Sequence, residues 1–101
     1  MAGSEYSKQS RLQYIIEEFQ DDLLMEIEPL LFSNTKPEEI ERTINAFIDK
    51  SKWKGLLPQD KLNFPPTALE KFQGTVDQEV ATTLRTTGCF YLGRWHSSCP
   101  V

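Results

Sequence analysis

Apolar residues recur at helical spacing along residues 8–32. Placed at 100° per residue, they fill a stripe that covers about half of a helix circumference: Leu12, Ile15, Ile16, Phe19, Leu23, Leu24, Ile27, Leu30 and Leu31. A second row, Tyr14, Met25 and Phe32, falls on the opposite side among acidic residues. A two-helix hairpin covers only the first stripe, so the pattern predicts a long helix that needs a second neighbour, within a bundle or on a partner.

A second helix is predicted over residues 36–52. Pro37 suits the first turn of a helix, where its missing N–H does no harm, and Thr35 is the expected N-cap. The two glutamates after Pro37 complement the positive end of the helix dipole. Its apolar residues form a single stripe: Ile40, Ile44, Phe47 and Ile48.

The connection between these helices is short. A link of only residues 33–35 makes the helices antiparallel neighbours, an αα-hairpin. Pro29 removes one backbone hydrogen bond late in the first helix, which predicts a kink or an early end near Glu28 and places residues 30–32 in a turn.

The middle of the chain is irregular but apolar. Gly55 ends the second helix, and residues 55–66 contain three prolines. This linker also carries four large apolar residues, Leu56, Leu57, Leu62 and Phe64, so we expect it to pack against the hairpin. Residues 66–73 can form two helical turns that end at Gly74.

A third helix is predicted over residues 76–87. Thr75 and Gln78 have capping-box spacing, and Val80 and Leu84 point inward on the predicted helix. Four threonines among residues 82–87 leave an extended conformation of residues 80–87 open as the alternative, because β-branched side chains favour strands.

The last segment, residues 88–101, is aromatic and punctuated by glycine. It either folds back as a strand-like arm on the bundle or forms an exposed docking peptide. The predicted fold is thus mainly α: a small hairpin or bundle of three to four helices with a proline-rich packed linker and an extended aromatic C-terminal arm. Residues 1–7 form a mobile N-terminus, 8–87 the helical domain and 88–101 the arm.

Composition limits the partners. A chain of 101 residues holds one modest core. The net charge of −4 is uneven, because residues 1–49 carry −7 (4 basic, 11 acidic) and residues 50–101 carry +3 (7 basic, 4 acidic). Overall acidity argues against nucleic acid as the main partner, and an acidic amphipathic helix does not suit an anionic membrane. Two cysteines, with no N-terminal apolar segment and no apolar run of 18 residues, indicate a cytoplasmic or other reducing intracellular compartment.

The candidate chemistry is sparse. Cys89, His96 and Cys99 are too few and too widely spaced for a structural zinc site, and we expect two free thiols, since a disulfide would require export. Consecutive acids such as Glu17 and Glu18 are ordinary on a solvated helix face. Trp53 among lysines resembles a base-stacking patch in composition, although the helix dipole already explains the lysines. The sequence therefore predicts no catalytic, cofactor or metal site.

The remaining prediction is a binding role. Two features indicate a non-enzymatic intracellular interaction module, a small subunit or adaptor that binds another protein or itself. The first helix has apolar residues on two sides, and the C-terminal arm is aromatic. The alternative is an acidic inhibitor or nucleic-acid mimic that blocks a basic site. The candidate partner-binding residues are Tyr14, Met25, Phe32, Phe90, Tyr91 and Trp95, with core packing the open alternative for the last three.

Overall fold

The computed structural model describes the backbone of residues 3–32, 34–64, 68–72 and 75–100, and the side chains of these residues from Tyr14 onward apart from that of Lys71. The described elements follow the order α1 (Gly3–Leu31), α2 (Pro37–Lys50), a 3-10 helix η1 (Ala68–Phe72), α3 (Gln78–Thr82), a π-helix η2 (Thr83–Thr87), β1 (Cys89–Tyr91) and β2 (Arg94–His96). The prediction of a mainly α fold is confirmed.

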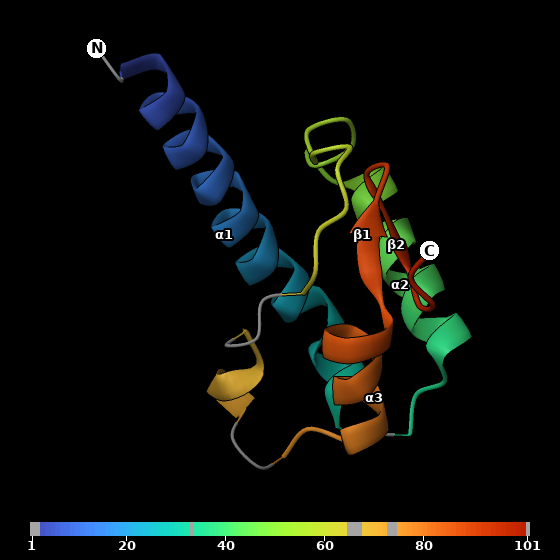
Figure 1. Ribbon diagram of the computed structural model, residues 1–101. Coiled ribbons are helices and arrows are strands. Elements are labelled where there is room, and N and C mark those ends of the chain that lie inside the picture. The colour runs from blue at the N-terminus through green and yellow to red at the C-terminus, as the bar shows by residue number, and fades with distance from the viewer. Residues whose placement is uncertain (1–2, 33, 65–67, 73–74, 101) are drawn as a thin grey trace.

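The two long helices form the predicted hairpin. In Figure 1, α2 runs back along the molecule in the direction opposite to α1, and the N-terminal turns of α1 extend beyond the other elements. The predicted stripe of α1 faces α2: Phe19, Leu23 and Ile27 are buried in one core cluster with Ile40, Ile44 and Ile48. The ring centroids of Phe19 and Phe47 lie 6.2 Å apart, which joins the two stripes directly.

Four predictions about the ends of these helices are wrong. Helix α1 begins at Gly3 rather than at residue 8, and it continues through Pro29 to Leu31. Proline at position 29 deprives only the carbonyl of Met25 of its partner, and Met25 lies on the exposed side, where water can hydrate that oxygen.

The N-cap of α2 is Lys36, not Thr35, because Pro37 occupies the first helical position. The Thr35 hydroxyl instead donates to the carbonyl of Leu30, 3.1 Å away, near the end of α1. Helix α2 ends at Lys50, two residues before the predicted end.

The linker packs against the hairpin as predicted, with one exception. Leu57 and Phe64 are buried and Leu62 packs at the edge of the core, whereas Leu56 is 53% exposed. Leu62 and Phe90 form an antiparallel bridge in which each backbone N–H donates to the other carbonyl at 2.8 Å. Of the helical turns predicted over residues 66–73, the structure describes η1, while Gly74 lies outside the described residues.

The segment of residues 78–87 is helical, so its extended alternative is wrong. Asp77, and not Thr75, is the N-cap, because its carboxylate accepts hydrogen bonds from the backbone N–H groups of Glu79 and Val80. The threonines fit a helix because the Thr83 hydroxyl donates to the carbonyl of Glu79, one turn earlier. Val80 and Leu84 are fully buried, as predicted.

The C-terminal arm is a β-hairpin that belongs to the core. Strands β1 and β2 pair antiparallel with Phe90 opposite Trp95. The turn between them places Leu92 (φ 55°) and Gly93 (φ 75°) in the left-handed region, the backbone pattern of the tight turn that matches strand twist. No helix in the described ranges is long and apolar enough to cross a membrane.

Candidate interaction surface

The six predicted partner-binding residues divide into two groups. Tyr14, Met25 and Phe32 are 60%, 77% and 46% exposed, while Phe90 and Trp95 are buried. Tyr91, at the end of β1, belongs to the exposed group at 37%. The core alternative therefore holds for Phe90 and Trp95, and the predicted partner-binding role of Trp95 conflicts with its full burial.

Tyr14, Met25 and Phe32 form the exposed row. Tyr14 and Met25 are eleven residues apart, which is close to three helical turns, so both project from the same side of α1 roughly 16 Å apart along the axis. The described stripe that faces α2 lies on the other side. Phe32 follows the last residue of α1, and its ring meets that of Phe72 edge-on at 5.7 Å, so one side of it is covered.

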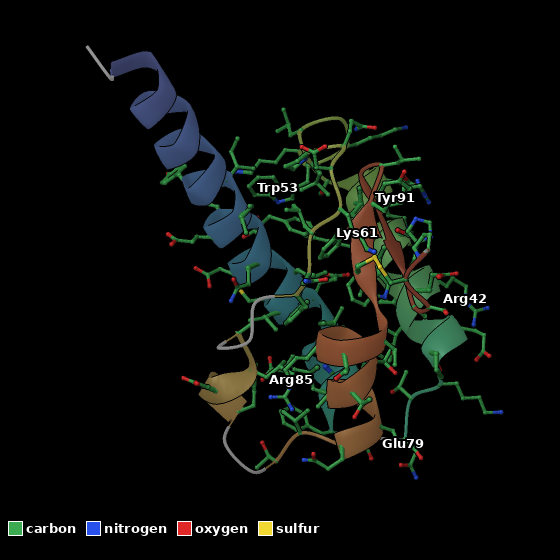
Figure 2. The ribbon with its side chains drawn as sticks, viewed as in Figure 1. Arg42, Trp53, Lys61, Glu79, Arg85 and Tyr91 are labelled. Atoms are coloured by element: carbon green, nitrogen blue, oxygen red, sulfur yellow. A yellow bond between two sulfur atoms is a disulfide. The ribbon has the colours of Figure 1, made fainter. Side chains whose placement is uncertain are left out.

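The surroundings of the exposed row are acidic. Residues 12–35 contain six acidic and no basic side chains. The Tyr14 hydroxyl donates to Glu18 at 3.1 Å, and this hydrogen bond together with the negative charge of Glu18 raises the pKa of Tyr14. Figure 2 shows oxygen-tipped side chains projecting from α1 on the side away from α2 and the hairpin.

The buried end of the arm is fixed by Asn45 of α2. Its side-chain amide donates to the carbonyl of Trp95 at 3.0 Å, and its side-chain oxygen accepts from the backbone N–H of Trp95 at 2.8 Å. The Trp95 ring packs edge-on against Phe90 and Phe64. Gly88 lies so close to this ring that a Cβ atom there would be 2.2 Å from it. Trp95 is therefore a structural centre of the fold.

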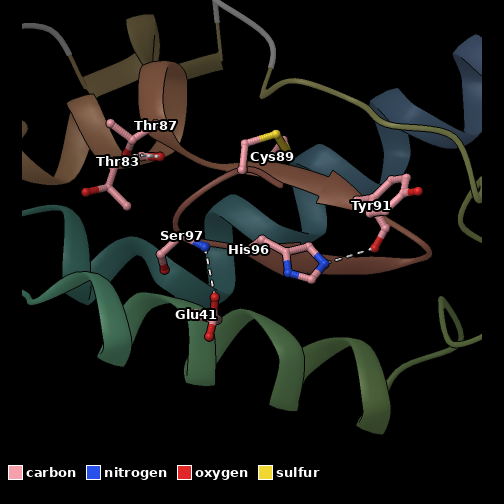
Figure 3. The surroundings of a disulfide bond; sticks show 8 residues. Glu41, Thr83, Thr87, Cys89, Tyr91, His96 and Ser97 are labelled. Atoms are coloured by element: carbon pink, nitrogen blue, oxygen red, sulfur yellow. Dashed lines mark hydrogen bonds between the residues drawn. A yellow bond between two sulfur atoms is a disulfide. The ribbon is translucent and has the colours of Figure 1, made fainter. Parts of the chain in front are cut away.

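The cysteines are not free thiols, so that expectation is wrong. Cys89 and Cys99 form a disulfide with 5.2 Å between their Cα atoms. Figure 3 shows a second contact that holds the C-terminal arm, in which the backbone N–H of Ser97 donates to Glu41 of α2. Sulfur atoms in a disulfide are not available as thiolate ligands, and among the described side chains no group of three His, Cys, Asp or Glu could hold a metal ion.

Trp53 is not a free stacking surface. It is buried after the end of α2, and its indole N–H donates to Asp22 of α1 at 3.0 Å. The Lys52 ammonium lies 5.0 Å from the centre of the ring. A nucleic-acid base could not stack on Trp53 without displacing these contacts.

Two hollows lie in the described surface. The first is an apolar cavity between α1 and the linker, lined by Ile16, Phe19, Leu57 and Phe64 among others, and its volume of about 20 Å³ admits little more than one water molecule. The second is an open depression of about 610 Å³, lined by Glu26 of α1 and, among others, by Glu39, Arg42 and Lys50 of α2. Its mixed charges define no single ligand class.

Sequence reasoning missed two contacts that fix the arm. The disulfide had a signal in the spacing of Cys89 and Cys99, whereas Asn45 carried none, because a polar residue on a helix is normally solvated. Comparison with protein-family models, curated proteins and solved structures finds no match to this chain, so its function must be argued from its own surface.

Proposed function

We propose that this protein is a non-enzymatic interaction module, a small subunit or adaptor of a larger protein assembly, and that it binds through the exposed row of α1. The observation that carries the proposal is the exposure of Met25 and Tyr14 on one line of a helix whose other side is buried.

The exposed row is unfavourable in the isolated chain. Burial of a methionine or an aromatic side chain is worth roughly 1.5–3 kcal/mol, which this molecule forgoes at these positions. Leu56 and Leu92 are also exposed, but single apolar side chains are normal on protein surfaces. The exposed row differs from these because Tyr14 and Met25 share one side of a rigid element and can be covered together by one partner.

A second candidate function is an acidic inhibitor or nucleic-acid mimic. It is favoured by the run of six acidic and no basic residues over positions 12–35. Such a protein would bind a basic site mainly by charge, so its affinity would fall steeply with salt and depend little on Met25.

The proposed setting is intracellular, and the disulfide constrains it. Disulfides persist mainly in oxidising compartments, so the bond between Cys89 and Cys99 does not clearly fit a reducing one. Cys89 is fully buried but Cys99 is only partly buried, so burial does not protect both sulfur atoms from a reductant. Alkylation of free thiols in freshly lysed cells tests the setting: extensive labelling of Cys99 would show that the bond is absent there, whereas protection would show that it survives.

The decisive experiment for the binding role is affinity purification from source cells with three full-length variants. We expect Met25→Ser to reduce recovery of the specific partner at least about tenfold, a loss of roughly 1.4 kcal/mol. The matched control, Leu56→Ser, removes an exposed apolar side chain elsewhere and should retain binding.

The third variant and a salt series separate the candidate functions. A double change of Glu17 and Glu18 to glutamine should abolish binding by a mimic, whereas an adaptor should keep most of its partner at raised salt. Partner binding unaffected by Met25→Ser would overturn the adaptor proposal. Helical circular dichroism checks that each variant is folded.

A further inference from the structure

The exposed row limits the shape of the surface that can cover it. Tyr14 and Met25 lie on a straight line along α1, with polar residues between them. A second helix laid along α1 can follow such a line, and the apolar residues that recur every three to four positions on its own surface would meet the row.

The charge around the exposed row limits the chemistry of that helix. Glu18 and Glu28 flank the row on α1, and this helix carries seven acidic residues against two basic ones, Lys8 and Arg11, which both precede Tyr14. Charges across a helix–helix contact are closer than the Debye length of about 10 Å, so ordinary salt does not remove their interaction. A partner with lysine or arginine beside its apolar stripe would be attracted.

A second copy of this chain does not fit the same surface. If two α1 helices packed through their exposed rows, the acidic side chains around one row would face those around the other, and like charges in contact are unfavourable. The acids on α1 thus distinguish a basic partner from self-association.

We infer that the partner contributes a basic amphipathic helix that lies along α1 and covers Tyr14 and Met25 with its apolar stripe. This inference rests on the proposed binding function and specifies the partner class for the same site. The apolar contact supplies affinity, and the charge pairs at its edges supply orientation and a faster association rate.

The test uses the full chain and three synthetic peptides of about 18 residues, five helical turns. The first places leucines at helical spacing with lysines beside them, the second replaces each lysine with glutamate, and the third is a scramble of the first. Fluorescence anisotropy measures binding of each labelled peptide at low and raised salt. We expect the first to bind at least about tenfold more tightly than the others, and Met25→Lys to weaken it by a similar factor while Leu56→Ser leaves it unchanged.

Several outcomes would overturn the inference. Equal binding of the scramble would reduce the effect to charge alone, and equal binding of the glutamate peptide would remove the charge argument. A dimer in sedimentation that Met25→Lys dissolves would assign the row to a second copy. If no peptide binds while partner recovery from cells still requires Met25, the helix inference fails and the proposed function stands. If that recovery does not depend on Met25, the proposed function fails as well.

Discussion

The hydrogen bonds between Asn45 and Trp95 are expected to hold the β-hairpin onto α2. Trp95 is fully buried, so its backbone N–H and carbonyl have no access to water and depend on the Asn45 side chain. Asn45→Ala leaves both groups unpaired, at roughly 1–3 kcal/mol for each buried group. Asn45 is itself only partly buried, so water can enter the space that its side chain leaves. We therefore expect a loss of about 2–3 kcal/mol in the free energy of unfolding.

The measurement is thermal unfolding of the full chain followed by circular dichroism. For a domain of this size the expected loss lowers the melting temperature by roughly 10–20 °C. Asn34→Ala is the matched control, because Asn34 is exposed in the loop between the helices and should contribute less than about 0.5 kcal/mol. Hydrogen exchange at the Trp95 amide reports locally and should accelerate in Asn45→Ala only.

Asn45→Asp separates the two hydrogen bonds. An aspartate still accepts from the Trp95 N–H, but near neutral pH it has no proton to donate and places a negative oxygen against the Trp95 carbonyl. Protonation restores a donor, so the stability difference between this variant and the wild type should shrink as the pH falls. If Asn45→Ala and the wild type unfold within about 0.5 kcal/mol of each other, the bonds contribute no net stability and the reasoning is refuted.

Three further predictions concern the core, the disulfide and the surface ion pair. Phe19→Ala should cost on the order of 3 kcal/mol or more, because Phe19 packs against several other rings, and unchanged melting would contradict this role. Cys99→Ser should lower stability by roughly 2–3 kcal/mol, and a reductant should bring the wild type to the same midpoint but leave the variant unaffected. A hydrogen bond from Arg94 lowers the pKa of Asp49. The pair therefore stabilises the fold above the ordinary pKa of an aspartate, and this contribution disappears as the pH falls through the lowered pKa. Melts of Asp49→Asn and the wild type should differ slightly at neutral pH and converge in acid.

The parts of the fold that periodicity determines could be predicted from the sequence. Apolar residues at helical spacing predicted which sides of α1 and α2 meet, and Phe19, Leu23 and Ile44 are buried together. The same wheel placed Met25 opposite the core, where it is 77% exposed. A helix has a fixed angular repeat, so its buried and exposed sides follow from spacing without knowledge of any partner.

Helix ends were less predictable because neighbouring side chains compete for the same backbone groups. Thr35 and Thr75 both had the expected chemistry of an N-cap, yet Lys36 and Asp77 occupy those positions. The choice depends on the direction from which the chain enters the helix. At α3 that direction is set by a distant contact, in which the backbone N–H of Asp77 donates to the carbonyl of Leu31.

The C-terminal arm could not be assigned from sequence because its aromatic residues suit a core and an interface equally well. Contacts far apart in the chain decide the matter: Leu62 bridges to Phe90 and Asn45 binds the backbone of Trp95. These contacts bury Phe90 and Trp95 but leave Tyr91 exposed, and the surface that we propose for a partner is the exposed row on α1, outside this segment. Met25 of this row can therefore be changed with little effect on folding, whereas a change at Trp95 would affect folding and binding together. Because of this difference, substitutions in the exposed row test binding without the complication of unfolding.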